Sequence, residues 1–177
     1  MAARDTPRPS PLPCVWLLSD ARNDAGLEGA IAALPPRSGF VFRHYHLPDV
    51  DRKTRFETLS NIARRHGHLV VLSRASGWGE DGSYGTRRLA DSGVWLATAH
   101  DADQIDAAGA AGADGIFLSP VFATRSHADR PRLGVHGFHV LAQRTALPVI
   151  ALGGMTAARA QELAWPRWGA IDGLAMG

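Results

Sequence analysis

Two loops in the C-terminal half of the chain carry groups that could bind a phosphate. Both follow short apolar runs typical of strands. They contribute hydroxyls, basic side chains and glycines, namely Thr124, Arg125, Ser126, His127, Gly153 and Gly154. Backbone amides approached over glycines at the start of a helix bind anions, and hydroxyls beside an arginine complete the hydrogen bonds of a phosphate. The two loops therefore predict a site for a phosphorylated ligand.

Each of these groups also has an ordinary structural explanation, which the sequence leaves open. The segment Thr124–His127 could be a surface turn, and Gly153-Gly154 could serve only as a tight turn between a strand and a helix. Arg43, at the end of another apolar run, could bind a phosphate or form a salt bridge with a neighbouring loop.

The elements that must position these loops are strands and helices that alternate along most of the chain, with a glycine-rich stretch after the third strand where the pattern thins. Eight apolar runs predict strands over Val15–Asp20, Gly39–His44, His68–Leu72, a brief stretch near Ser83, Val94–Ala97, Ile116–Leu118, Val149–Leu152 and Ile171–Ala175. Helical spacing and end signals predict helices over Gly26–Leu34, Arg52–His66, Asp101–Ala111, Val135–Arg144 and Thr156–Trp165. Repeated strand–helix units imply a parallel α/β sheet, and eight strands imply a closed (β/α)8 TIM-type barrel. A doubly wound open sheet is the alternative, but no G-x-G-x-x-G follows the first strand.

The length requires a shortened barrel. The chain has 177 residues, whereas this fold usually needs at least about 200. We expect the helix between the third and fourth strands, and everything after the eighth strand, to be missing. Residues 14–177 are predicted to form this single domain, preceded by a disordered lead-in over residues 1–13 that contains four prolines.

Composition indicates a globular protein, and its charge balance suits either a phosphorylated small-molecule ligand or simply a solvated arginine-rich surface. The chain is 45% hydrophobic and 20% charged with a net charge of +2, and it has no basic block that would indicate nucleic-acid binding. It has no secretory signal and no run of about 20 apolar residues, so we expect a cytoplasmic protein without a membrane partner. The only cysteine, Cys14, is expected to be a buried structural thiol. A homodimer could cover apolar surface that a missing last helix would expose.

The segments GADGIFLSPVFATRSH, LPVIALGGMT and LATAHD, with weaker matches at VFRHYHLP and VWLLSD, resemble the thiamine phosphate synthase family, which includes the related thiazole tautomerases. The resemblance implies a (β/α)8 barrel. It also implies a transferase that joins a pyrimidine methyl pyrophosphate to a thiazole phosphate, with loss of Mg-bound pyrophosphate. Such a reaction depends mainly on holding both partners and stabilising the leaving anion.

The resemblance also implies roles for individual residues. The two hydroxyls for the thiazole phosphate correspond to Thr124 and Ser126, and the family's diglycine corresponds to Gly153 and Gly154. Its pyrophosphate-binding serine corresponds to Thr98, and its second-strand arginine to Arg43. The residues expected at the reacting centre are Arg43, Thr98 and His127. Those expected to bind substrate are Thr124, Arg125, Ser126, Gly153, Gly154, His100 and Tyr45.

Other positions depart from the family pattern. Lysines of the family are replaced by His127 and Tyr45, and a pyrimidine-side glutamine by Val41. The Asn-Asp pair that ends the third strand and binds magnesium and pyrophosphate is replaced by Leu72 and Ser73. The phosphate-binding serine after the eighth strand would fall just past Gly177. No cofactor is therefore evident, magnesium is expected only if carried with pyrophosphate, and synthase turnover is predicted to be weak or absent.

The run Arg43-His44-Tyr45-His46 raises a metal alternative. H-x-H at the end of a barrel strand is used by metal-dependent hydrolases, but alternate residues of a strand face opposite ways. If Arg43 points into the site, His44 and His46 point outward, and no strand-end aspartate follows to complete a metal site. We therefore predict no metal ligands.

Two classes of function remain. The chain could be an enzyme of thiamine biosynthesis, either a synthase with an altered pyrophosphate site or a tautomerase-like isomerase. The histidine of the tautomerases has no secure counterpart, since Ser119 stands where it is expected. Alternatively, the chain could be a regulatory barrel that kept the phosphate site and lost the chemistry.

Overall fold

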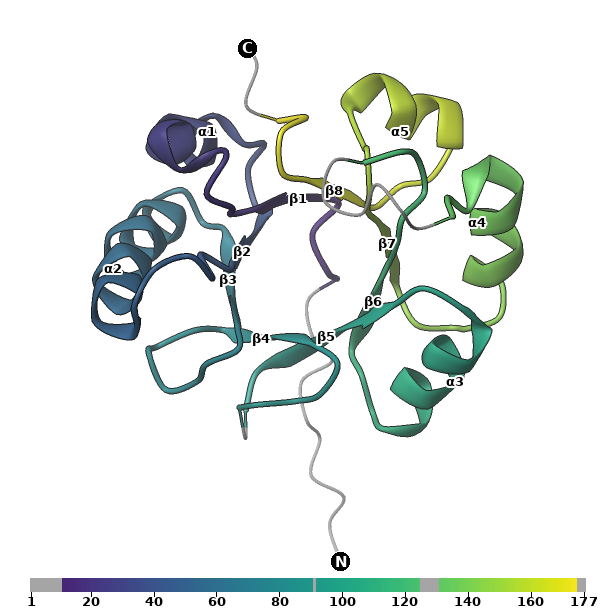
Figure 1. The fold of residues 1–177 in the computed structure, drawn as a ribbon, viewed down its shortest axis with the longest axis horizontal. Helices are drawn as coiled ribbons and strands as arrows, with labels where there is room; N and C mark the ends of the chain where they lie inside the picture. The colour runs from purple at the N-terminus through teal and green to yellow at the C-terminus, as the bar shows by residue number, and fades with distance from the viewer. Residues whose placement is uncertain (1–10, 91, 125–130, 175–177) are drawn as a thin grey trace, which may run out of the picture.

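The computed structural model describes residues 11–90, 92–124 and 131–174 and shows a closed barrel of eight parallel strands (Figure 1). The strands are β1 Val15–Leu18, β2 Gly39–Phe42, β3 Leu69–Ser73, β4 Gly82–Gly85, β5 Val94–Ala99, β6 Gly115–Leu118, β7 Val149–Ala151 and β8 Trp168–Ala170. Each strand pairs with the next in sequence, and β8 pairs with β1. The predicted TIM-type barrel is confirmed.

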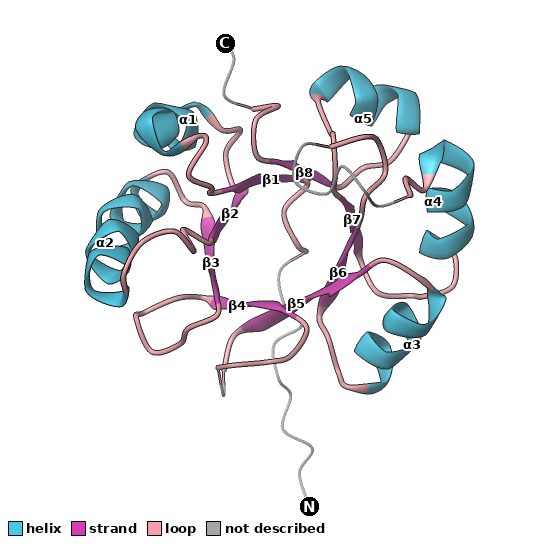
Figure 2. Cartoon of the chain, in the orientation of Figure 1, coloured by secondary structure: helices cyan, strands magenta, loops and turns pink. Residues whose placement is uncertain are grey.

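Helices cover the barrel unevenly (Figure 2). They are α1 Leu27–Ala33, α2 Asp49–Arg65, α3 Ala102–Ala110, α4 Gly134–Ala142 and α5 Ala157–Leu163, with a 3-10 turn, η1, over Asp24–Gly26. The described residues between β3 and β4, and those between β4 and β5, form loops without a helix. The expected loss of the helix after the third strand is thus confirmed, and the described residues between β4 and β5 likewise contain no helix.

Two of the helices begin at the caps that their sequence predicts. The Asp101 carboxylate accepts a hydrogen bond from the Gln104 amide at 2.9 Å and begins α3. The Thr156 hydroxyl accepts from the Arg159 amide at 3.2 Å and begins α5. Such caps satisfy amides that the helix cannot satisfy itself, and the second one fixes the loop that carries the diglycine.

The eighth strand was predicted wrongly over Ile171–Ala175; it begins three residues earlier. The Trp168 amide donates to the Cys14 carbonyl at 2.9 Å, and Gly169 lies beside Trp16, where an added Cβ would sit 3.1 Å from the Trp16 Cβ. Pairing with β1 therefore selects Trp168–Ala170. The residues that follow β8, 171–173, line the cavity at the rim of the barrel.

The barrel interior is filled by alternate residues of the strands, which include Trp16, Leu18, Val41, Val71, Tyr84, Leu96, Phe117 and Ile150. Leu12 packs into the same cluster and is only 9% exposed, so the predicted disordered lead-in does not extend this far; residues 1–10 lie outside the described part. Cys14 was expected to be buried but is exposed, because it precedes β1 at the closed end of the barrel. No helix in the described ranges is both long and apolar enough to cross a membrane.

Candidate functional site

A cavity of about 670 Å³ opens at the carboxyl ends of the strands. All the predicted site residues that the structure describes line it: Arg43, Tyr45, Thr98, His100, Thr124, Gly153 and Gly154. The closed barrel brings them together because every parallel strand ends at the same rim. Arg125, Ser126 and His127 lie outside the described residues, so their roles stay predictions.

One wall of the cavity is formed by the loops after β6 and β7, which are tied to each other. The Val121 amide donates to the Leu152 carbonyl at 2.9 Å, and the Phe122 amide donates to the Gly153 carbonyl at 3.0 Å. Gly153 and Gly154 have φ values of 99° and 62°, and a Cβ on Gly153 would lie 2.7 Å from the Pro120 Cα. The diglycine is therefore required by packing, and it holds backbone close to Thr124 on the same wall.

Arg159 also lines this wall and was missed by the sequence analysis. Its guanidinium donates to the Gly154 carbonyl and lies 5.1 Å from the centroid of the Phe122 ring. The sequence could have indicated this position, because Arg159 lies three residues after the helix cap Thr156. The first turn of a helix that follows a barrel strand lies at the rim of the barrel.

Arg43 directly follows β2, lines another side of the cavity, and is bonded to residues that follow β1. Its backbone amide donates to Ser19 Oγ at 2.8 Å, its Nε donates to the Ser19 carbonyl at 2.9 Å, and its Nη2 lies 3.0 Å from Asp20 Oδ2. Burial would raise the pKa of Asp20, but a backbone hydrogen bond from Arg22 and the charges of Arg43 and Arg22 lower it overall. Asp20 thus stays ionised and orients Arg43.

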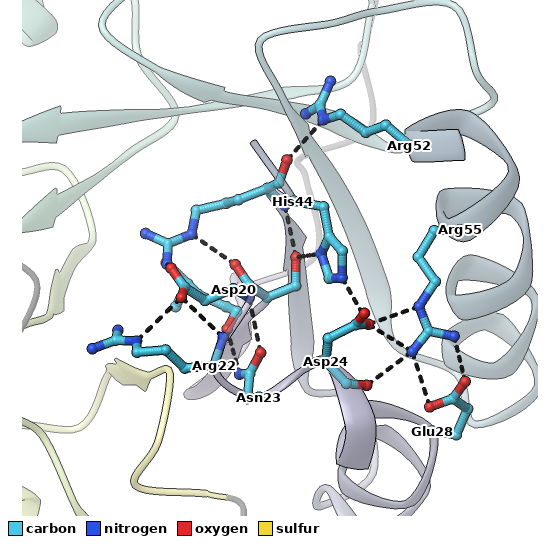
Figure 3. A network of polar contacts seen from close by, with 11 residues as sticks. Asp20, Arg22, Asn23, Asp24, Glu28, His44, Arg52 and Arg55 are labelled. Atoms are coloured by element: carbon cyan, nitrogen blue, oxygen red, sulfur yellow. Dashed lines mark hydrogen bonds and ion pairs between the residues drawn. The ribbon is translucent and has the colours of Figure 1, made fainter. Parts of the chain in front are cut away.

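A buried polar network supports this wall from behind. His44 is fully buried; its Nδ1 lies 2.8 Å from Ser19 Oγ and its Nε2 lies 2.8 Å from Asp24 Oδ1. Arg55 binds the same Asp24 oxygen at 2.7 Å and also pairs with Glu28 (Figure 3). Burial lowers the pKa of His44, which favours the neutral ring. Ser19 is fully buried, so this Ser–His–Asp chain supports the wall and presents no nucleophile to the cavity.

The H-x-H run is arranged much as strand geometry predicts. Arg43 and Tyr45 line the cavity, whereas His44 is buried behind the wall and His46 is exposed. Within the described ranges, ligand atoms of Asp24, His44 and His46 lie within 4.8 Å of one another. A cation there would compete with the Arg55 guanidinium, which already occupies the Asp24 carboxylate.

The β3 side of the cavity is built around Tyr45. Its hydroxyl lies 2.6 Å from Ser73 Oγ, and the Arg74 guanidinium stacks 3.9 Å from the centroid of its ring. Beneath them, Arg52 Nε donates to the Arg43 carbonyl at 2.8 Å, and Arg52 Nη2 donates to the Ser73 carbonyl. Arg74 was missed by the sequence analysis, although it directly follows the end of the third strand.

His100 contacts Ser119, the residue at the position where the histidine of the tautomerases was expected. Its Nδ1 is 2.7 Å from the Ser119 carbonyl and 3.3 Å from Ser119 Oγ. Thr98 lies on the same strand end, half-buried. Tyr84 of β4 also lines the cavity, and burial raises its pKa to about 12, so its phenol stays protonated. The β4–β6 side of the cavity therefore offers an imidazole and neutral hydroxyls.

Comparisons with known proteins agree with this architecture. A putative thiamine-phosphate synthase 2 from Aquifex aeolicus is 37% identical over 59 residues, which cover 33% of this chain and 32% of that protein, so the match spans about a third of the relative's length. A thiamine phosphate pyrophosphorylase from Pyrococcus furiosus superposes with a TM-score of 0.76 at 18% identity, covering 91% of this chain and 86% of the other. A FabK mutant from Thermotoga maritima has a TM-score of 0.60 at 11% identity, covering 92% and 61%. These two likenesses show the fold.

Family membership follows from the sequence itself. The model of the family described as thiamine monophosphate synthase matches residues 85–176, just over half of the chain. The matched region runs from the end of β4 to beyond β8 and contains the diglycine, Thr98 and Thr124. The chain therefore belongs to the thiamine monophosphate synthase family.

Proposed function

We propose that this protein binds a thiazole phosphate in its cavity and acts in thiamine biosynthesis. The observation that carries the proposal is the meeting of Thr124 with the Gly153-Gly154 backbone on one wall of the cavity. A hydroxyl and backbone amides from adjacent loops can donate to the same phosphate, whose oxygens are strong acceptors. The volume of about 670 Å³ also falls within the range of small-molecule sites.

Further positive charge supports an anionic ligand on this wall. Arg159 lines it beside Gly154. From the sequence we assign a second hydroxyl to Ser126 and additional cationic contacts to Arg125 and His127. Together these groups would neutralise and orient one phosphate.

We further propose that a pyrimidine methyl pyrophosphate is the second substrate, with Arg43, Thr98, His100 and Tyr45 facing it. In the transferase reaction the bond from the pyrimidine methyl carbon to pyrophosphate breaks and a bond to the thiazole nitrogen forms. The protein would contribute by holding both partners and stabilising the departing charge. The third strand ends without a carboxylate, so Mg-dependent turnover should be weak.

A second candidate function is an isomerase that acts on the same thiazole phosphate. The contacts of His100 with Ser119 favour it, since they place an imidazole in the cavity next to the diglycine wall. An imidazole is the side chain most often used to move a proton near neutral pH.

The binding proposal can be tested by thermal shift with a thiazole phosphate. At 100 times its dissociation constant the ligand should stabilise the wild-type protein by about 2.7 kcal/mol. Thr124→Ala should weaken binding about tenfold, because one hydrogen bond to a charged group contributes about 1.5 kcal/mol. Thr58→Ala is the matched control, since Thr58 lies exposed on α2 away from the cavity. Product formation with the pyrimidine substrate and Mg²⁺ is measured in parallel.

An equal ligand-induced shift in wild type and Thr124→Ala would refute the proposed phosphate site. Robust Mg-dependent synthesis would contradict the expectation of weak turnover but would keep the substrate assignment. Isomerisation of the thiazole phosphate that is lost in His100→Ala would establish the second candidate.

A further inference from the structure

We propose that Arg74, stacked on Tyr45, forms a second anion site across the cavity from the diglycine, and that this site binds pyrophosphate without a divalent metal. The inference rests on the proposed function and adds to it the residue whose positive charge binds the pyrophosphate. Strand β3, which leads into Arg74, lies across the barrel from β7, which leads into the diglycine (Figure 1).

The position of Arg74 is held by its surroundings. Its guanidinium lies 3.9 Å from the centroid of the Tyr45 ring, and the Tyr45 hydroxyl is bound to Ser73 Oγ at 2.6 Å. Stacking on an aromatic ring orients the planar guanidinium of an arginine. Its N–H groups lie in the guanidinium plane, parallel to the ring, and stay available to a ligand. The side chain is exposed at the rim and lines the cavity, so an anion inside can reach it.

The backbone at Arg74 is strained, with a φ of 56°. A left-handed conformation costs a residue other than glycine about 1–2 kcal/mol. Glycine would adopt it without that cost, yet an arginine stands here. A positive φ does not by itself indicate a ligand, since Arg37 at the closed end of the barrel has a φ of 59°; its consequence at Arg74 is that a glycine substitution should be tolerated by the backbone.

The charges around Arg74 distinguish it from the neighbouring arginines. Arg43 is paired with Asp20, and Arg22 with both Asp20 and Asp172. Arg74, by contrast, forms no ion pair with a carboxylate of any described residue, and its guanidinium packs on the Tyr45 ring. A guanidinium that has no carboxylate partner at the rim of a cavity favours an anionic ligand. Two of its N–H groups can donate to two oxygens of one phosphate.

The residues at the end of β3 do not fit a magnesium ion. Leu72 and Ser73 are buried and offer no carboxylate; Ser73 Oγ is bonded to Tyr45, and its carbonyl accepts from Arg52. In the described part of this wall, Asp20 and Asp172 are both engaged by arginines. Magnesium is normally held through carboxylate oxygens. Arg74 can instead supply the positive charge for the anion.

The experiment is calorimetric titration of inorganic pyrophosphate into the full chain in EDTA, and again with excess Mg²⁺. Wild type should bind in EDTA, and Arg74→Gly should bind at least tenfold more weakly. The glycine variant should fold, because it relieves the left-handed backbone. Arg37→Gly is the matched control: Arg37 is exposed, has a φ of 59°, and precedes β2 at the closed end of the barrel. Its pyrophosphate affinity should equal that of wild type.

Two results would overturn the inference: pyrophosphate binding by wild type only when Mg²⁺ is present, or unchanged binding by Arg74→Gly. A thiazole phosphate titration separates this inference from the proposed function. Arg74→Gly should keep the wild-type affinity for thiazole phosphate, and a parallel loss there would refute the idea of two sites. If wild type binds pyrophosphate through Arg74 but does not bind thiazole phosphate, the proposed function fails and this site stands.

Discussion

At the scale of single residues, Gly154 serves packing and binding together. It has a φ of 62°, and an added Cβ would come within 3.0 Å of the Ala123 carbonyl oxygen. The same residue presents its carbonyl to Arg159 and lines the cavity beside Thr124. The absence of a side chain thus lets the loops after β6 and β7 touch, and this contact brings the hydroxyl and the backbone of the proposed phosphate site together.

We predict that Gly154→Ala lowers the free energy of unfolding by about 2–4 kcal/mol, since a backbone penalty of about 1–2 adds to an overpacking penalty. Gly67→Ala separates the two contributions. Gly67 has a φ of 72° but no heavy atom within 4 Å of an added Cβ, so it should lose only about 1–2 kcal/mol. Urea denaturation measures both variants. Equal losses would show that the close approach at Gly154 carries no cost.

At the scale of elements, the segment before β1 closes the lower end of the barrel. Leu12 is 9% exposed and packs with residues from the strands, and an added Cβ on Gly115 would lie 2.6 Å from its Cδ1. The Trp16 indole Nε1 donates to the Pro13 carbonyl at 2.8 Å, which ties this segment to β1. The segment thus acts as part of the core although it has no regular secondary structure.

Leu12→Ala should therefore lower the free energy of unfolding by about 2–3 kcal/mol, because it leaves a cavity among buried side chains. Val50→Ala, at a residue of α2 that is 78% exposed, should change it by less than about 0.5 kcal/mol. Both values come from urea denaturation at neutral pH. A Leu12→Ala protein as stable as wild type would mean that the lower end is closed by other groups.

At the scale of the whole molecule, buried histidines tie strands to helices and make stability depend on pH. The Ser38 amide donates to His68 Nδ1 at 3.2 Å, and His68 Nε2 lies 3.0 Å from the Ile31 carbonyl of α1. Because Nδ1 accepts, the ring is satisfied only when it is neutral. Burial accordingly lowers the pKa of His68, and burial also lowers that of His44.

We expect the free energy of unfolding to fall as the pH drops from 7.5 to 5.5. In the unfolded chain these imidazoles take up protons near their ordinary pKa of 6.5, whereas the native state binds them only at lower pH, so acid favours the unfolded state. His68→Gln should reduce this pH dependence, whatever its effect on stability at pH 7.5. His136→Gln, at an exposed position on α4, should leave it unchanged. A wild-type protein equally stable at both pH values would contradict the assignment of neutral buried rings.

The sequence by itself determined the barrel and most of its rim. Alternating apolar runs and helix caps are local signals, and in a closed parallel barrel they suffice to bring Arg43, Thr98 and Gly153 to one cavity, because all strands end on the same side. The family resemblance likewise rested on contiguous segments of sequence. Only the tertiary structure decided features that depend on distant partners. Pairing with β1 set the start of β8 at Trp168, and packing inside the barrel buried Leu12. Stacking on Tyr45 placed Arg74 at the rim. Local sequence carries no record of such partners, since their energies arise only when the chain has closed.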